Sequence, residues 1–194
     1  CGSVGGWWKV QPFLIALFTS TAVPLVPNGQ EFGEDHFIPE DDSCTGRRVS
    51  SRPLRWKRRH DSIGEAMVAL HRRLAAVRAE HPALRSPLMY PDKWEEWQNE
   101  FNLAGVGVDV HRQLAIYHRW ASVDHGVDNI VVVLNFSDED QTVDVPFPCN
   151  GTWNDLLAGF HGGPGWSVDV MGPHAGVQVG SHFGRILHHF NPTV

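Results

Sequence analysis

The sequence lacks several features that would mark a common class of protein. It contains three cysteines, Cys1, Cys44 and Cys149, whose number is odd and whose spacing matches no metal site. A disulfide framework is therefore not expected, which favours a reducing, cytoplasmic location, although a chain that begins at Cys1 leaves secretion open. No apolar run approaches the ~20 residues that a membrane helix needs, so no membrane partner is expected.

Catalytic and ligand-binding signatures are also scarce. The sequence has no Gly-x-Ser-x-Gly element, and its 12 histidines form no His-Glu-x-x-His pattern. The glycine-rich run at 162–165 precedes neither a lysine nor a helical pattern, so it predicts a turn rather than a phosphate loop. The net charge is −6, and the basic cluster at 47–59 follows an acidic run at 40–42. We therefore expect the acidic and basic runs to form ion pairs with each other, and we expect no nucleic-acid partner. Since the ligand-binding signatures are missing, we expect neither a cofactor nor a metal.

What the chain does contain is 42% hydrophobic residues, arranged first with helical and later with strand periodicity. The spacing predicts a helix over 10–18, with Pro12 in its first turn. If nothing covers this helix, it leaves an apolar patch exposed, made of Phe13, Leu14, Leu17 and Phe18. Leu25–Val26 lies between prolines and predicts a buried strand end that enters a loop.

A second helix is predicted over 63–81. Ser62, with Glu65 three residues later, has the spacing of a capping box, and Pro82 ends the pattern. Arg72 lies off the apolar face of this helix. That face consists of Ile63, Met67, Leu70, Leu74 and Val77.

From about residue 105 the periodicity becomes that of strands separated by short turns rich in glycine, proline, asparagine and aspartate. No helical pattern interrupts the strands, which favours an antiparallel sandwich over a parallel sheet. The predicted strands are Gln113–Trp120, Asn129–Phe136, Gln141–Phe147, Gly151–Leu157, Trp166–Val170, Ala175–Val179 and Gly184–His188.

Four stretches, in this order, together resemble one family. They are ALFTSTAVPLVPNGQEFGED at 16–35, PLRW at 53–56, SIGEAMVALHRRLAAVRAEHPAL at 62–84 and IVVVLNFSDEDQTVDVP at 130–146. The first resembles the end of an α-amylase-type barrel, the second and third its last helix, and the fourth the first hairpin of the all-β domain that follows. The chain thus resembles the carboxy-terminal part of the α-amylase family of glycoside hydrolases (family 13).

The resemblance implies an α+β chain, in which a partial (β/α)8 TIM-barrel end precedes an antiparallel β-sandwich. The implied domains are an incomplete barrel end at 1–86, a connector at 87–104 and an all-β domain at 105–194. The family is a retaining one that acts on α-glucans with two carboxylates ~5–5.5 Å apart. By this resemblance the catalytic residues lie upstream of Cys1, so the chain alone is expected to be inactive and to need the remainder of the barrel as a partner.

Three residues after the implied last barrel strand are candidates for binding substrate. Gln30 and Glu31 would lie at the carboxyl-end rim, where barrel enzymes build their sites, and Phe32 could stack on a sugar. The alternative is that the two polar residues satisfy backbone groups of their own loop and that Phe32 packs beneath it. His60–Asp61 resembles the family's Asn-His-Asp element, but its place before a helix predicts capping instead.

Two further alternatives stay open at this level. The acidic residues from Glu34 to Asp42 could hold calcium, but they lack the spacing of an EF-hand loop, and a solvated loop facing the arginines is favoured. The whole chain could also be a non-catalytic carbohydrate-binding or interaction module, since such modules share the sandwich. A free-standing module, however, has no use for the 53–84 helix with its family-like ending, nor for a lone barrel strand.

Overall fold

The computed structural model describes residues 4–34, 53–160 and 165–193. The chain divides into two compact units, one formed by 1–7 and 25–72 and the other by 8–24 and 73–194. The helices are η1 (Val4–Val10), α1 (Gln11–Thr19), η2 (Gln30–Phe32), η3 (Trp56–His60), α3 (Ser62–Glu80), α4 (Pro82–Arg85) and η4 (Trp94–Glu96). No described helix is both long and apolar enough to cross a membrane.

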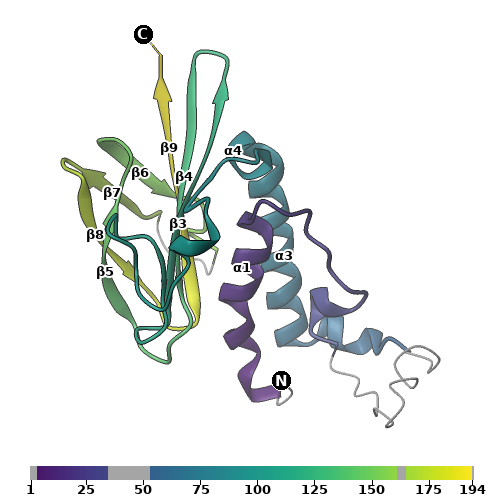
Figure 1. Ribbon diagram of the computed structural model, residues 1–194. Helices are drawn as coiled ribbons and strands as arrows, with labels where there is room; N and C mark the ends of the chain where they lie inside the picture. Colours follow the sequence, from purple (N-terminus) through teal and green to yellow (C-terminus); the bar gives the residue numbers. More distant parts are fainter. Residues whose placement is uncertain (1–3, 35–52, 161–164, 194) are drawn as a thin grey trace. The chain divides into compact units, whose positions relative to one another are not determined.

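The second unit is built on two antiparallel sheets (Figure 1). The larger sheet has the order β1-β3-β4-β9-β6-β7, with β2 also paired to β3, and β5 pairs with β8 in the smaller one. The strands are β1 (Met89–Tyr90), β2 (Gly107–Asp109), β3 (Leu114–Val123), β4 (Gly126–Asn135), β5 (Gln141–Pro146), β6 (Gly151–Asp155), β7 (Ser167–Val170), β8 (His174–Val179) and β9 (Phe183–Pro192). The predicted α+β class with an antiparallel sandwich is confirmed.

Strand β4 lies at the centre of this unit and is buried along almost its whole length. Its Val131 and Val133 belong to the core cluster that also contains Trp153 and Val177. Its other face is also buried, because α1 packs against β4 and β9, and α4 against β3 and β4. The outer strands β5 and β8 instead alternate between buried and exposed residues, as expected where one face meets solvent.

Helix α1 begins with Pro12 in its first turn and ends at Ser20, whose backbone is extended. Packing against the sheet buries Leu14, Ile15 and Phe18, so the expected uncovered patch is wrong for Leu14 and Phe18. Phe13 alone among the predicted patch residues is strongly exposed, at 62%. The helix thus has a partner within the chain, which sequence periodicity could not reveal.

Helix α3 matches its predicted span, and its first turn is capped by Asp61. The Asp61 carboxylate accepts a hydrogen bond from the Gly64 N–H at 2.8 Å, which confirms capping by this residue and places the cap one residue before Ser62. Near the other end, Arg78 donates to the carbonyls of Phe18, Ser20 and Ala22. Arg78 therefore satisfies carbonyl groups at and just beyond the end of α1, which have no partner within that helix.

The first unit contains η2, η3 and the beginning of α3 in its described part. Leu25–Val26 does not form a strand there, and Leu25 is 82% exposed. The prediction of a buried strand end at this position is therefore wrong. A parallel barrel strand receives its backbone hydrogen bonds from neighbouring strands. Every strand pair in the described residues is antiparallel and lies in the other unit, so Leu25–Val26 has no such neighbour.

A buried arginine joins three segments of the second unit. Arg119, on β3, is 0% exposed, and its guanidinium donates to the carbonyls of Thr19, Ser86 and Leu88. Beside it, the Tyr117 hydroxyl lies 2.5 Å from the hydroxyl of Thr19, and burial raises the pKa of Tyr117 to about 12. These bonds fix the end of α1 and the segment after α4 against the sheet.

Replacing Leu74 tests the predicted buried face of α3. Leu74 is 1% exposed, so Leu74→Ala should lower the free energy of unfolding by about 2–5 kcal/mol, through lost burial and the cavity left behind. Arg72 is exposed, so Arg72→Ala should change it by no more than about 0.5 kcal/mol. Denaturant midpoints of the two variants are compared side by side, and a larger effect of Arg72→Ala would show that the buried face is misassigned.

Replacing Arg119 with lysine tests the three-carbonyl junction. A lysine ammonium lacks the planar fork of donors, and each buried carbonyl left without a donor costs about 1–3 kcal/mol. We therefore expect Arg119→Lys to destabilise the protein by about 3 kcal/mol in denaturant unfolding. Arg112→Lys is the control, since Arg112 is exposed and lies just before β3 in the sequence. If the two substitutions lowered the free energy of unfolding equally, the proposed role of Arg119 would be wrong.

Candidate functional site

The three predicted substrate-binding residues form a single turn of 3-10 helix between two glycines. Gly29 and Gly33 both have left-handed backbones, with φ of 93° and 73°. A Cβ atom on Gly29 would lie 2.8 Å from side-chain atoms of Glu34 and Leu54, so this position demands glycine for space as well as conformation. The Asn-Gly-Gln-Glu-Phe-Gly run thus specifies a tight, defined turn.

Within this turn the three side chains have different environments. Gln30 is exposed, and Glu31 accepts a hydrogen bond from the Gly29 N–H at 2.9 Å. Phe32 is 1% exposed, with its ring 5.7 Å from that of Trp56. The ring of Phe32 thus packs beneath the turn, as the packing alternative expects. A substrate-binding role for Gln30, Glu31 and Phe32 stays a prediction.

The sequence predicted ion pairing between the acidic and basic runs, but it did not identify the pair that holds the turn in place. The Glu34 carboxylate accepts hydrogen bonds from the Arg55 backbone N–H at 2.7 Å and from the Arg55 guanidinium at 2.5 and 2.8 Å. The side chain of Glu34 is only 8% exposed. This pair joins the 29–34 turn to the PLRW segment, two motifs that the sequence analysis recognised separately.

The pair also bears on the calcium alternative for the acidic loop. Both carboxylate oxygens of Glu34 are engaged by Arg55, as the favoured acid–arginine interpretation expects for this residue. The other acidic residues of that run, 35–42, lie outside the described residues. The sequence indicated such pairing because the acidic and basic clusters are near each other in the chain, but this does not show which residues pair.

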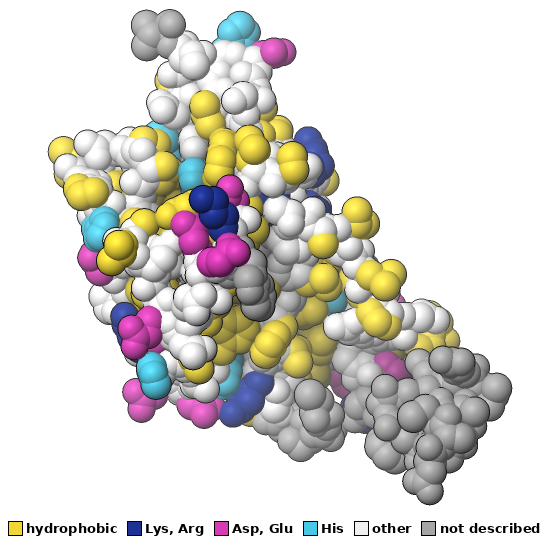
Figure 2. All heavy atoms as spheres, viewed as in Figure 1, with side chains coloured by type: hydrophobic (Ala, Val, Ile, Leu, Met, Phe, Trp, Pro, Cys, Tyr) yellow, Lys and Arg dark blue, Asp and Glu magenta, His cyan; other side chains and the backbone are white. Residues whose placement is uncertain are grey.

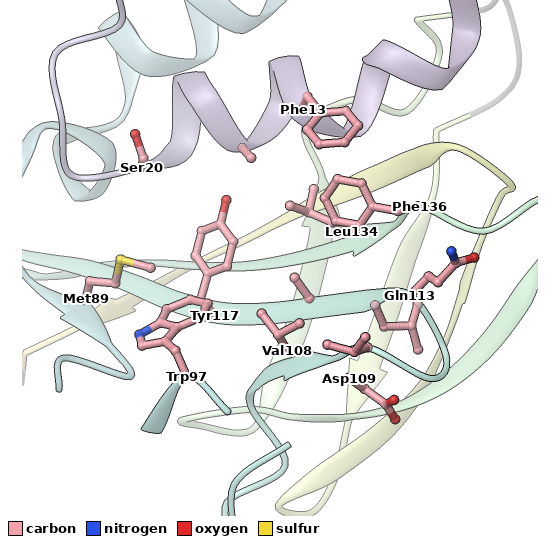
Figure 3. A pocket seen from close by; sticks show the side chains of 14 residues that line it. Phe13, Ser20, Met89, Trp97, Val108, Asp109, Gln113, Tyr117, Leu134 and Phe136 are labelled. Carbon is pink, nitrogen blue, oxygen red and sulfur yellow. The ribbon is translucent and has the colours of Figure 1, made fainter. Parts of the chain in front are cut away.

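The second unit contains a cavity of about 750 Å³ beside α1 and β3. Figure 3 shows the rings of Phe13 and Phe136 at one side of it and the side chains of Trp97 and Met89 at the other. Figure 2 shows hydrophobic side chains gathering where α1 lies beside the strands. The complete lining is Phe13, Ala16, Ser20, Met89, Trp97, Val108, Asp109, Val110, Gln113, Leu114, Ala115, Tyr117, Leu134 and Phe136.

The side chains that line this cavity are mostly apolar. Its only carboxylate belongs to Asp109, which accepts a hydrogen bond from the Arg112 N–H at 2.9 Å. Retaining glycoside hydrolysis needs two carboxylates ~5–5.5 Å apart, so the cavity does not meet that requirement. The Tyr117 hydroxyl at its wall is already bonded to Thr19, and its raised pKa keeps it protonated. The cavity can receive an apolar or aromatic surface.

Comparison with known proteins identifies the fold. No family model and no curated protein matches the sequence. Among solved structures, AmyP in complex with maltose matches 99% of this chain and 36% of its own length, at a TM-score of 0.68 and 15% identity. The α-amylase from Geobacillus thermoleovorans, complexed with acarbose, matches 97% of this chain and 34% of its own, at a TM-score of 0.60 and 14% identity.

The same likeness extends to a γ-CGTase from alkalophilic Bacillus clarkii, with a TM-score of 0.57 and 16% identity over 95% of this chain. That match covers 23% of the γ-CGTase, so this chain spans about a third or less of the proteins reported. The chain therefore has the fold of part of an α-amylase-type enzyme. The resemblance predicted from four ordered motifs is confirmed at the level of the fold.

Replacing Glu34 tests whether the ion pair holds the 29–34 turn. Glu34→Gln removes the charge that strengthens its hydrogen bonds to Arg55, and such bonds contribute about 1.5–3 kcal/mol when buried. Since Arg55 is 37% exposed, we expect the lower end of that range, seen as faster amide exchange at residues 29–34. Glu80→Gln, at an exposed position of α3, should leave exchange there unchanged. Unaltered exchange in Glu34→Gln would contradict this role.

Proposed function

We propose that this chain is the carboxy-terminal part of an α-amylase-family retaining glycoside hydrolase or transglycosylase that acts on α-glucans. The observation that carries the proposal is the fold match over nearly the whole chain to enzymes of this type. The four sequence motifs support it independently, since they occur in the order that the family resemblance implies. Complexes of the matching proteins with maltose, maltotriose and acarbose support the substrate class.

Under this proposal the chain supplies support for the catalytic site and leaves bond cleavage to the remainder of the barrel. The turn at 29–34 would lie at the carboxyl-end rim of the barrel, with Gln30 as an exposed hydrogen-bonding group. The Glu34–Arg55 pair would hold that turn, and Glu31 would stiffen it through Gly29. Retention would require a nucleophile and an acid/base carboxylate from outside this chain.

An activity assay tests the proposal directly. The isolated chain is incubated with soluble starch, and reducing ends are measured against buffer. We expect no activity, because the proposed catalytic carboxylates are absent from it, whereas a longer protein that contains the chain and an upstream barrel should release reducing ends or transfer glucan chains. In that longer protein, Gln30→Ala should lower kcat/KM, by about tenfold if the side chain bonds the sugar, or leave it unchanged if it serves only the loop.

Two results would overturn the proposal. One is starch hydrolysis by the purified isolated chain that is lost in Glu31→Gln, since the chain would then contain its own catalytic centre. The other is tight starch binding by the isolated chain, in affinity electrophoresis, combined with no activity in the longer protein. That combination would favour the non-catalytic carbohydrate-binding module.

A further inference from the structure

Two histidines and an aspartate from three separate segments meet in the second unit. His81 is the residue between α3 and α4, Asp128 lies near the start of β4, and His188 lies on β9. Asp128 pairs with Phe190 across the β4–β9 ladder, so His188, two residues away, is its diagonal neighbour on the same face. The fold therefore brings together groups that are 47 and 60 positions apart in the sequence.

The three side chains converge on a small volume. Asp128 Oδ1 lies 2.8 Å from His188 Nε2 and 3.6 Å from His81 Nδ1. The two imidazole rings have centroids 4.4 Å apart, and the donor atoms of all three residues lie within 4.8 Å of one another. Four-coordinate zinc bonded to nitrogen and oxygen at ~2.0–2.2 Å separates its ligand atoms by about 3.3 Å. The two distances from the carboxylate oxygen to the imidazole nitrogens, 2.8 and 3.6 Å, lie on either side of that value.

The carboxylate at the centre is buried and oriented. The Asp128 side chain is 5% exposed, and its Oδ2 accepts a hydrogen bond from the Ala83 N–H at 2.8 Å, which leaves Oδ1 facing the two imidazoles. The bond from the Ala83 N–H fixes the orientation of the carboxylate, and a backbone contact of this kind orients metal ligands.

We propose that His81, Asp128 and His188 form a binding site for a divalent transition metal, with zinc as the representative ion. Two imidazoles and one carboxylate suit zinc and its neighbours, whereas calcium and magnesium prefer all-oxygen sites. The side chains of His81 and His188 are 15% and 22% exposed, which leaves access for an ion and for a water as fourth ligand. The bound ion would join the α3–α4 junction to β4 and β9.

The alternative for the same atoms is a hydrogen-bonded cluster without a metal, in which the imidazoles donate to Asp128. The two arrangements differ in what the nitrogens do. A metal takes the lone pair of a neutral imidazole, whereas the metal-free cluster needs a proton at the same place. Two measurements therefore distinguish the metal site from the metal-free cluster: the binding of zinc, and the protection of these nitrogens from chemical modification by zinc.

Zinc titration of the full chain tests the proposal. Calorimetry should show one equivalent of Zn²⁺ bound, and Co²⁺ should give the visible absorption bands of a four-coordinate site. His81→Gln and His188→Gln should each weaken Zn²⁺ binding by about tenfold or more. His174→Gln is the matched control, because His174 forms an exposed histidine–aspartate pair with Asp144 at 2.8 Å, and it should leave the affinity within about twofold.

A measurement on the unmodified protein keeps the test decisive if a variant fails to fold. Diethyl pyrocarbonate modifies free imidazole nitrogens, and mass spectrometry locates the adducts. Zn²⁺ should protect His81 and His188 and leave His174 reactive. Equal protection of all three histidines, an affinity unchanged in both His81→Gln and His188→Gln, or no saturable binding in the unmodified chain would overturn the proposal. None of these readouts depends on glycosidase activity, so the proposal stands or falls apart from the proposed function.

Discussion

The second unit depends on a charge buried where three segments meet. Arg119 projects from β3 without contact with solvent, and burial lowers the pKa of Arg119 from its ordinary value. Its guanidinium is compensated by three backbone carbonyls rather than by a carboxylate. Arginine suits this position because its planar fork directs several donors at once. The arrangement fixes how the end of α1 and the segment after α4 lie on the sheet, which in turn shapes the cavity beside them.

A second group of buried polar contacts lies on β4, the strand next to β3. Asp128 on β4 binds the first turn of α4 through Ala83 and faces His81 and His188 with its other oxygen. Buried polar groups are costly unless they are bonded, so each such junction permits essentially one docking geometry. Apolar packing supplies most of the driving force for the same layers, but it is less specific about register. The helices on β3 and β4 are thereby held by both kinds of interaction.

Under the proposed function, the fold of this chain and the catalytic chemistry belong to different parts of a longer protein. The described residues provide two antiparallel sheets, a turn at 29–34 held by an ion pair, and an apolar cavity with a single carboxylate among its lining residues. An α-glucan enzyme of the retaining type needs a pair of carboxylates on rigid elements. The chain's part in such an enzyme would be to hold a rim turn and to present apolar surface, which are tasks of support and positioning.

Sequence patterns predicted much of this structure wherever the determining interactions are local. All seven predicted strands overlap observed ones, because alternation and turn residues act over a few positions. The long helix and its start near Asp61 follow from the same kind of signal. The predictions of a strand end at Leu25–Val26 and of exposed Leu14 and Phe18 on α1 were wrong, because a strand needs neighbouring strands and a helix face needs a packing partner. A short segment does not specify either of these. The environment of Phe32 likewise depends on another segment, since its ring lies beside that of Trp56.

The sequence by itself therefore determined the class of the fold, the order of its elements and the family that they resemble. Only the tertiary structure decided that Glu34 pairs with Arg55, that Arg119 serves three carbonyls, and that His81, Asp128 and His188 meet. The physical reason is the same in each case. Periodicity records which side of an element is apolar, whereas a polar contact depends on the distance and direction between groups far apart in the chain, and folding alone sets those.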